Sequence, residues 1–302
     1  MPKRTLRFHY WLLLLLFAGI QSCKVEKSFI PAYIEINQVD LDASSISGNN
    51  IHDIKAIQVY VNNQTVGTFP IPCKFPIDAS GKVEIKATAF VKINGNSQTL
   101  TPFKSLDIIS DTLTVNREMT TIWKPVFKFR NNIEIVWQED FEDSSATLVP
   151  IFKDSLNYLK IESRPFNLND RFTGNSLMFV SRFENNDSAG IVELAYFNKI
   201  KSLPTDGRDI ILEFDVYTDL PILFWYLRYP PFGPPLDEDY VPFLTVNPTK
   251  GKWKRFYLNI VPDIQGKDPA TQYELYFRCD KPENFSGSTE FLIDNIRLSY
   301  LR

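Results

Sequence analysis

The feature that most constrains the fold of this chain is a succession of short runs in which apolar and polar residues alternate, separated by turn signals. The runs at residues 32–39, 54–61 and 82–93 alternate in this way. Asn62-Asn63 and Asn94-Gly95 stand where hairpin turns need residues that tolerate left-handed backbone. From residue 29 onwards, no segment of any length has the period of a helix. The pattern predicts an all-β protein.

The turn spacing divides the chain into two units. Seven or so strand candidates fall within about 100 residues, from 31 to 130, which is typical of a β-sandwich. Roughly ten further candidates fall between residues 131 and 302, which suits a jelly-roll. We therefore expect an N-terminal immunoglobulin-like β-sandwich at 31–130, followed by a C-terminal jelly-roll β-sandwich at 131–302.

The charge balance argues against one class of partner. The chain has 33 basic and 36 acidic residues, and three of the basic ones, Lys3, Arg4 and Arg7, lie within the first 22 positions. A chain that begins at residue 23 would carry 30 basic and 36 acidic residues. Binding to nucleic acid needs a clustered basic surface, so we expect no nucleic-acid partner.

The first 23 residues have the pattern of an export signal. A short basic head precedes an apolar run at residues 11–20, and Ser22 and Cys23 follow. The run is too short to cross the roughly 30 Å hydrocarbon core of a bilayer as a helix. The pattern predicts a signal peptide over residues 1–22 and a polar tether over residues 23–30.

Residues 20–23, Ile-Gln-Ser-Cys, also resemble the lipobox of bacterial lipoproteins, in which the cysteine is acylated. The resemblance implies a palmitate-type lipid on Cys23 and attachment to the outer membrane through that lipid alone. The charged residues that follow Cys23, and Asp-Ser/Thr-apolar triplets such as Asp111-Thr112-Leu113, resemble features of exported Bacteroidota proteins. A plain signal peptide with an incidental cysteine is the alternative, since Gln21 departs from the commonest lipobox.

Few side chains are available for nucleophilic or zinc chemistry. If Cys23 is acylated, Cys73 and Cys279 remain, and they fall in different units. We expect two separate buried thiols, with an inter-domain disulfide as the alternative. After residue 22 the only histidine is His52, in a turn rich in Gly and Asn. We therefore expect neither histidine-based catalysis nor a Cys/His zinc site.

The first unit contains a recognisable local pattern. VYVNNQTVGTFPIPCKFPID, followed by GKVEIKATAFV, combines a strand, an Asn turn, a glycine, prolines and a second glycine before an alternating strand. It resembles the small immunoglobulin-like or PEGA-type sandwich modules of bacterial envelope proteins. That resemblance implies a spacer or scaffold role.

The second unit carries a motif at each of its ends. Asp140-Phe141-Glu142 stands near its start, and Ile293-Asp294-Asn295-Ile296 lies in its last strand candidate. The pairing resembles galactose-binding-like, carbohydrate-binding-module and MAM-type jelly-rolls. It implies that the first and last strands are neighbours, and that Asp140, Glu142 and Asp294 share a structural calcium ion. A solvated acidic turn is the alternative.

Paired carboxylates raise the question of glycoside hydrolysis. Glu213-Phe214-Asp215 begins like the E-x-D-x-x-E signature of laminarinase-type glycosidases, but Thr218 stands at the position of the third acid. Without that acid the chemistry of two acting carboxylates is incomplete. We therefore expect no enzyme activity.

Segment 220–243 gathers aromatic side chains around a proline-rich loop. Alternation places Phe224 and Tyr226 on one face of a strand and Trp225 on the other, and one of these faces must be core. The candidate ligand-binding residues are Trp225, Tyr226, Tyr229, Phe232 and Tyr240. The alternative is that these aromatics close the sandwich.

These observations predict a non-catalytic lipoprotein of the cell envelope that binds a glycan through residues 131–302. The first alternative is a structural or assembly role, in which the jelly-roll docks onto another outer-membrane protein. A glycoside hydrolase is the third.

Overall fold

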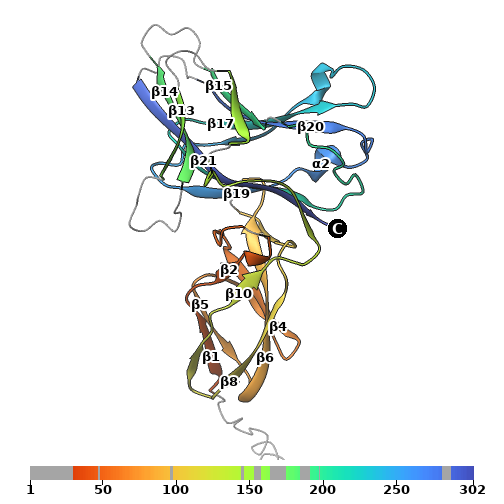
Figure 1. Ribbon diagram of the computed structural model, residues 1–302. Coiled ribbons are helices and arrows are strands. Elements are labelled where there is room, and N and C mark those ends of the chain that lie inside the picture. Colours follow the sequence, from red (N-terminus) through yellow and green to blue (C-terminus); the bar gives the residue numbers. More distant parts are fainter. Residues whose placement is uncertain are drawn as a thin grey trace, which may run out of the picture.

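The computed structural model describes residues 30–46, 48–95, 98–143, 146–152, 158–163, 175–183, 191–196, 198–280 and 287–302. These residues form strands connected by turns, with short helical segments, and the expected all-β fold class is confirmed. Figure 1 shows two units placed end to end. Within the described residues, strands β1 to β10 pair only with one another, and so do strands β11 to β21.

The N-terminal unit is a sandwich of small sheets in the orders β5-β1-β9, β10-β2 and β4-β3-β6-β7, with β8 also paired to β6. Its strands are β1 (Ala32–Ile36), β2 (Asp40–Asp42), β3 (Ala56–Val61), β4 (Gln64–Pro70), β5 (Cys73–Ile77), β6 (Gly81–Lys92), β7 (Leu100–Pro102), β8 (Ile109–Val115), β9 (Thr120–Ile122) and β10 (Val126–Lys128). A 3₁₀ turn, η2 (Ser44–Ile46), follows β2.

The two expected hairpin turns of this unit are present. Asn62 and Asn63, between β3 and β4, have φ angles of 48° and 66°. Asn94 and Gly95, after β6, have φ angles of 56° and 67°. Asn62 and Asn63 alone connect the paired residues Val61 and Gln64, and positive φ at both matches the right-handed twist of the flanking strands, which is why Asn is favoured there. Asn94 and Gly95 lie in a longer connection, between Lys92 and its partner Leu100 on β7.

The C-terminal unit is a sandwich of two larger sheets. One has the order β13-β14-β21-β16-β19, with β11 also paired to β21, and the other has the order β12-β15-β20-β17-β18. The strands are β11 (Ile133–Glu139), β12 (Leu148–Phe152), β13 (Tyr158–Ser163), β14 (Asn175–Phe183), β15 (Ile191–Tyr196), β16 (Ile210–Thr218), β17 (Ile222–Tyr229), β18 (Tyr240–Val246), β19 (Lys254–Asn259), β20 (Gln272–Asp280) and β21 (Gly287–Leu301). A 3₁₀ turn, η3 (Asp237–Asp239), precedes β18, and a single helical turn, α2 (Val261–Ile264), follows β19. Antiparallel pairing of β11 with β21 confirms that the first and last strands of the unit are neighbours.

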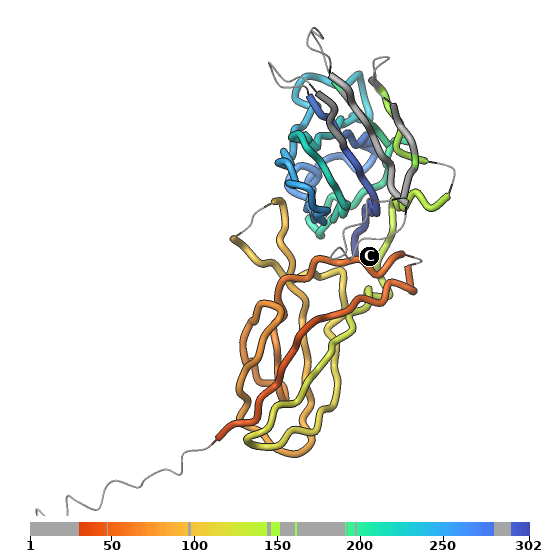
Figure 2. Tube along the Cα trace, turned by 90° about the vertical axis from the view of Figure 1, so that its left-hand side faces the viewer, coloured from red at the N-terminus to blue at the C-terminus, as the bar shows by residue number. Residues whose placement is uncertain are grey.

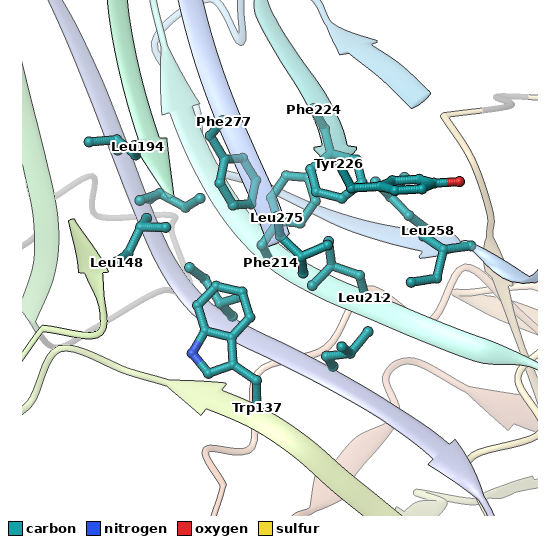
Figure 3. Packing of buried hydrophobic residues seen from close by; sticks show 14 of the residues in the cluster. Trp137, Leu148, Leu194, Leu212, Phe214, Phe224, Tyr226, Leu258, Leu275 and Phe277 are labelled. Carbon is teal, nitrogen blue, oxygen red and sulfur yellow. The ribbon is translucent and has the colours of Figure 1, made fainter. Parts of the chain in front are cut away.

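The core of the C-terminal unit lies between its two sheets. Side chains from β16, β17 and β20 meet there, because alternate residues of each strand point inward. Phe214, Phe224 and Phe277 form a mutually contacting aromatic group with ring centroids 5.2–6.4 Å apart. Figure 3 shows this group together with Trp137 and Tyr226.

The two units share an interface on the β19–β16–β21 side of the C-terminal sandwich. Tyr257 of β19 packs edge-on against Phe103 of the N-terminal unit, with centroids 5.0 Å apart, and its hydroxyl accepts the Asp53 N–H at 2.9 Å. The hairpin turn after β6 reaches the same strand: the Asn94 N–H donates to the Tyr257 carbonyl at 2.9 Å, and Asn94 Oδ1 accepts the Asn259 N–H at 2.7 Å. Figure 2 shows this hairpin extending from the N-terminal unit towards the C-terminal one. The second sheet of the sandwich therefore has its outer face on the side away from the N-terminal unit (Figure 1).

Candidate functional site

The candidate site lies on the outer face of the sheet β12-β15-β20-β17-β18. In β17, Phe224 and Tyr226 point into the core, whereas Trp225 and Tyr229 alternate with them and point outward. In β20, Tyr276 and its alternate neighbours point to the same outer face. The period of two in each strand thus brings aromatic side chains from adjacent strands together.

Three rings from three adjacent strands form a stack on this face. Trp225 lies directly opposite Tyr276 in the register of β17 and β20, with ring centroids 4.0 Å apart and planes inclined by 9°. Tyr240, at the start of β18, stacks on Trp225 at 5.8 Å and 25°. Tyr276 and Tyr240 thus stack on the indole from the two strands that flank β17. Tyr240 is 52% exposed and is the ring of the stack most open to a ligand.

Two carboxylates are held in place by these aromatics. Trp225 Nε1 donates to Glu193 Oε1 at 2.8 Å. The hydroxyls of Tyr229 and Tyr276 both donate to Glu274 Oε2 at 2.6 Å. Burial and the Glu274 carboxylate together raise the pKa of Tyr229 to about 12, and the same causes raise the pKa of Tyr276. Both phenols therefore remain neutral donors at physiological pH.

A cavity of about 550 Å³ opens beside the ring stack, on the side of Glu193. It is lined by Glu193, Leu223, Trp225, Tyr240, Pro242, Arg278 and Asp280. Arg278 Nε forms an ion pair with Asp280 Oδ1 at 2.7 Å. A cavity of this size that combines an aromatic wall with a few polar groups is typical of small-molecule sites.

Only some of the five aromatic residues expected to bind a ligand lie at the cavity. Trp225 and Tyr240 line the cavity, and Tyr229 lies further along the same face. Tyr226 is 1% exposed in the core (Figure 3), so its assignment to the binding surface is wrong: it alternates along β17 with Trp225, which points outward. Phe232 is 88% exposed on the loop before β18 and is not among the residues that line this cavity.

Sequence reasoning missed most of the polar residues of the face. Glu274, Tyr276, Arg278 and Asp280 stand at every second position of β20, so the period of that strand contained a signal for them. Glu193 comes from β15, which is brought beside β20 only by the fold. A single sequence does not reveal that pairing.

The three expected calcium ligands are not brought together. Among the described residues, no group of three His, Cys, Asp or Glu side chains is placed to hold a metal ion. Asp294 is buried and its Oδ1 accepts the Asn295 N–H at 2.6 Å, whereas Glu142 is exposed and its N–H donates to Asp140 Oδ1 at 3.2 Å. Calcium binding by this set stays a prediction that the donor geometry does not support.

A neighbouring carboxylate organises the turn after β11 instead. Glu139 is 6% exposed, and its two oxygens accept the N–H groups of Phe141 at 2.9 Å and Thr147 at 2.6 Å. Asn295, in the motif that suggested calcium, has a φ of 50° and lies where the register between β16 and β21 shifts. The motif is thus the site of a β-bulge in the last strand.

Glu213 and Asp215, the start of the glycosidase-like pattern, are buried and paired with arginines. Arg255 bonds to Glu213 Oε2 and Asp215 Oδ1, both at 3.1 Å. Arg297 bonds to the two oxygens of Glu213 at 2.9 and 2.7 Å. Asn295 Nδ2 donates to Asp215 Oδ2 at 2.7 Å. These carboxylates neutralise structural arginines and are not open to a substrate.

The N-terminal unit covers part of this ionic cluster. The guanidinium of Arg297 lies 4.3 Å from the ring centroid of Phe129, at the end of the N-terminal unit. Ile211 and Tyr257, from the same side of the sheet, belong to the apolar cluster of the N-terminal unit. The face that suggested an active site is therefore an interface between the two units.

The remaining sequence expectations concern cysteines and anchoring. Cys73 and Cys279 are free thiols in different units, and burial raises the pKa of Cys279 to about 12. Cys23 and the signal at residues 1–22 lie outside the described residues. Within the part of the chain that the structure describes, no helix is both long and apolar enough to cross a bilayer.

Comparison with known proteins gives matches among solved structures only. No family model matches the chain, and no curated protein does. A structure of carbohydrate-binding modules from the β-sandwich superfamily matches 81% of this chain and 85% of its own, at 14% identity and a TM-score of 0.36. The family 11 carbohydrate-binding module of Clostridium thermocellum, in complex with a β-1,3-1,4-mixed-linked tetrasaccharide, matches 55% of this chain and 94% of its own, at 15% identity and a TM-score of 0.33. The enzymatically active domain of tailspike protein 4 from bacteriophage CBA120 matches 54% of this chain and 20% of its own, at 15% identity and a TM-score of 0.37. Likeness at this level says nothing about which ligand this chain binds.

Proposed function

We propose that this protein binds a glycan, without catalysis, on the outer face of the sheet β12-β15-β20-β17-β18. The observation that carries the proposal is the cavity of about 550 Å³, which combines the Tyr240 and Trp225 rings with the side chains of Glu193, Arg278 and Asp280. Sugar rings present apolar C–H faces that pack on aromatic rings, and hydroxyls that bond to carboxylate and guanidinium groups. The lining supplies both kinds of contact.

The placement of the two units is consistent with this role. The N-terminal unit packs against the β19–β16–β21 side, through Tyr257 and Ile211, and leaves the cavity on the opposite sheet. We further propose that the chain is exported, acylated on Cys23 and held in the outer membrane, with the N-terminal sandwich as a spacer. Mass spectrometry of the purified N-terminal peptide tests this part: a diacylglycerol-modified Cys23 supports it, and an unmodified cysteine contradicts it.

Binding is best tested with one ligand-face variant and one matched control. Tyr240→Ala removes the exposed ring of the stack, while Phe232→Ala removes an even more exposed ring outside the cavity. We expect the wild-type chain and Phe232→Ala to bind the same members of a glycan array, with calcium and with a chelator, and Tyr240→Ala to lose at least about tenfold in affinity. Absence of any glycan binding by the wild type contradicts the proposal.

One observation favours a second candidate function, docking onto another envelope protein. Phe232 is 88% exposed and Leu236 is 59% exposed, on a loop that contains four prolines. The base of the loop is fixed by the ion pair of Arg228 Nε with Asp239 Oδ1 at 3.2 Å, between side chains that are 12% and 14% exposed. A rigid loop that presents apolar side chains is suited to a protein partner, because little entropy is lost on binding.

The two candidates predict opposite effects of the same variants. If the loop docks onto a protein, Phe232→Ala with Leu236→Ala abolishes co-purification of a defined envelope partner, and Tyr240→Ala preserves it. If the glycan proposal holds, Tyr240→Ala weakens binding to the glycan array, whereas Phe232→Ala with Leu236→Ala preserves it. Thermal unfolding of each variant shows whether the fold is intact.

A further inference from the structure

Two carboxylates on the outer face are held by aromatic donors in the same manner. Glu274 accepts hydroxyl hydrogens from Tyr229 and Tyr276 at 2.6 Å, and Glu193 accepts the indole N–H of Trp225 at 2.8 Å. In each case an acceptor-only group is fixed next to the ring of its donor. Such a pair combines a full negative charge with the electron-rich face of an aromatic ring.

At the first of these pairs, the chain places an ammonium group of its own. Lys199 Nζ lies 3.3 Å from the centroid of the Tyr229 ring, whose hydroxyl is bound to Glu274. A cation over an aromatic face is attracted by the quadrupole of the ring, and the carboxylate adds Coulomb attraction. This end of the face therefore already contains an ammonium ion in an aromatic and acidic setting.

The second pair faces the cavity. Glu193 and the rings of Trp225 and Tyr240 all line it. Its charged side chains are the carboxylates of Glu193 and Asp280 and the guanidinium of Arg278, which is ion-paired with Asp280 at 2.7 Å. The lining thus carries one more negative than positive charge, and Tyr240 offers an exposed ring.

We propose that this cavity takes a saccharide that carries a protonated amine, with Glu193 as its counter-ion and Tyr240 as the aromatic face. The inference rests on the proposed function and narrows its ligand to amino sugars with a free amine. Saccharides that carry carboxylates are disfavoured, because they would place a like charge beside Glu193.

Matched ligands test the proposal on the full wild-type chain. Glucosamine, galactosamine and mannosamine are each compared with the N-acetylated and the simple hydroxyl form of the same sugar, by ligand-observed NMR titration at mildly acidic pH. We expect at least one amine to bind about tenfold more tightly than both of its neutral counterparts. We also expect this advantage to shrink in high salt, because screening weakens the attraction between charges.

A charge-removing variant assigns the preference to one residue. Glu193→Gln keeps an oxygen acceptor for Trp225 Nε1 and removes the charge, so it should abolish the preference for the amine over both of its neutral counterparts. Glu118→Gln, at an exposed glutamate of the N-terminal unit, is the matched control and should keep the preference.

Failure of this inference is distinguishable from failure of the proposed function. Equal or tighter binding of the neutral sugars, or a preference that persists in Glu193→Gln, overturns the amino-sugar assignment and leaves glycan binding standing. Absence of binding to every sugar and to the glycan array overturns both.

Discussion

At the scale of single residues, the C-terminal unit places charged side chains in two contrasting settings. Glu213 and Asp215 are 1% and 0% exposed, and both are bound by arginine. Glu193 and Glu274 lie on the outer face and are bound by aromatic N–H and O–H donors. A buried charge needs an opposite charge as compensation, whereas a charge at a surface cavity remains available to a ligand.

Removing the charge of Glu213 should strongly destabilise the fold. Glu213→Gln leaves Arg255 and Arg297 buried with one carboxylate fewer between them. Loss of one partner from a buried ion pair typically lowers the free energy of unfolding by about 3–5 kcal/mol, which urea denaturation measures. Asp206→Asn, in an ion pair with Arg208 at the surface, is the comparison and should have little effect. Equal effects of the two substitutions would contradict the structural role of Glu213.

The tyrosines of the outer face should make stability depend on alkaline pH. The pKa of Tyr229 is raised to about 12, above the value of about 10 for an unfolded chain, so the folded protein retains a proton that the unfolded chain has lost. The stabilisation is complete below about pH 10 and is lost as the pH rises through about 12. In thermal melts, the advantage of the wild type over Tyr229→Phe should therefore shrink across this range.

A second hydroxyl provides the comparison for that experiment. Tyr60→Phe removes a phenol that donates to the neutral amide of Gln58 at 2.7 Å, so no carboxylate is involved. If the melting temperature of the wild type exceeds that of Tyr229→Phe by the same amount from about pH 9 to about pH 12, the raised pKa of Tyr229 is contradicted.

At the scale of elements, turns are the parts of this chain whose function extends beyond connecting strands. Asn94 and Gly95 close a hairpin, and Asn94 also bonds to Tyr257 and Asn259 of the other unit. The preference of such turns for Asn and Gly is local chemistry and was predictable from sequence. The second contact was not predictable, because it depends on where the hairpin meets a strand more than 150 residues away.

Gly95→Ala should destabilise the protein through two separable effects. The φ of 67° is unfavourable for a residue with a Cβ, which costs about 1–2 kcal/mol. The new Cβ would also stand 3.1 Å from Leu244 Cδ1 in the C-terminal unit. Gly81→Ala is the matched control, since its φ is 84° and nothing lies within 4 Å of its added Cβ. We expect Gly95→Ala to lower the free energy of unfolding more than Gly81→Ala does.

A double-mutant cycle shows whether the larger loss of stability in Gly95→Ala comes from the contact with Leu244. In a Leu244→Ala background the added Cβ has room, so the difference between the two glycine substitutions should disappear. If the two glycine substitutions still differ in their free energy of unfolding in the Leu244→Ala background, contact of the added Cβ with Leu244 is not the cause of the difference.

Strand alternation in a single sequence predicts the fold class, but it does not predict which face of each strand is buried. Period-two alternation correctly predicted the all-β class and placed Phe224 and Tyr226 on the face of the strand opposite to Trp225, but it did not decide which of the two faces is core. The two faces of β17 are both rich in aromatics, so hydrophobicity alone does not separate them. Likewise, Glu213 and Asp215 alternate as exposed residues would, because the face they occupy is covered by another unit.

At the scale of the whole molecule, the two sandwiches are joined by buried contacts as well as by the chain. Phe103 and Phe129 of the N-terminal unit pack on Tyr257 and Arg297, respectively. Ile211 of β16 is 4% exposed within the N-terminal apolar cluster. A C-terminal unit without its neighbour would expose this apolar surface and part of an arginine cluster. Each unit is therefore part of the stabilising environment of the other.

We predict that the two units unfold together. In calorimetry the full chain should give one cooperative transition, and the isolated segment 131–302 should melt lower by about 5 °C or more, since it lacks the contacts to Phe103 and Phe129. Lys104→Ala, which removes only an ion pair with Asp209 from a lysine side chain that is 63% exposed, is the control and should leave the transition single. Two separate transitions, one of them coinciding with that of the isolated segment, would mean that the interface adds no stability. The N-terminal sandwich would then act as a spacer alone, and the burial of Glu213 and Arg297 would have to be maintained by the C-terminal unit itself.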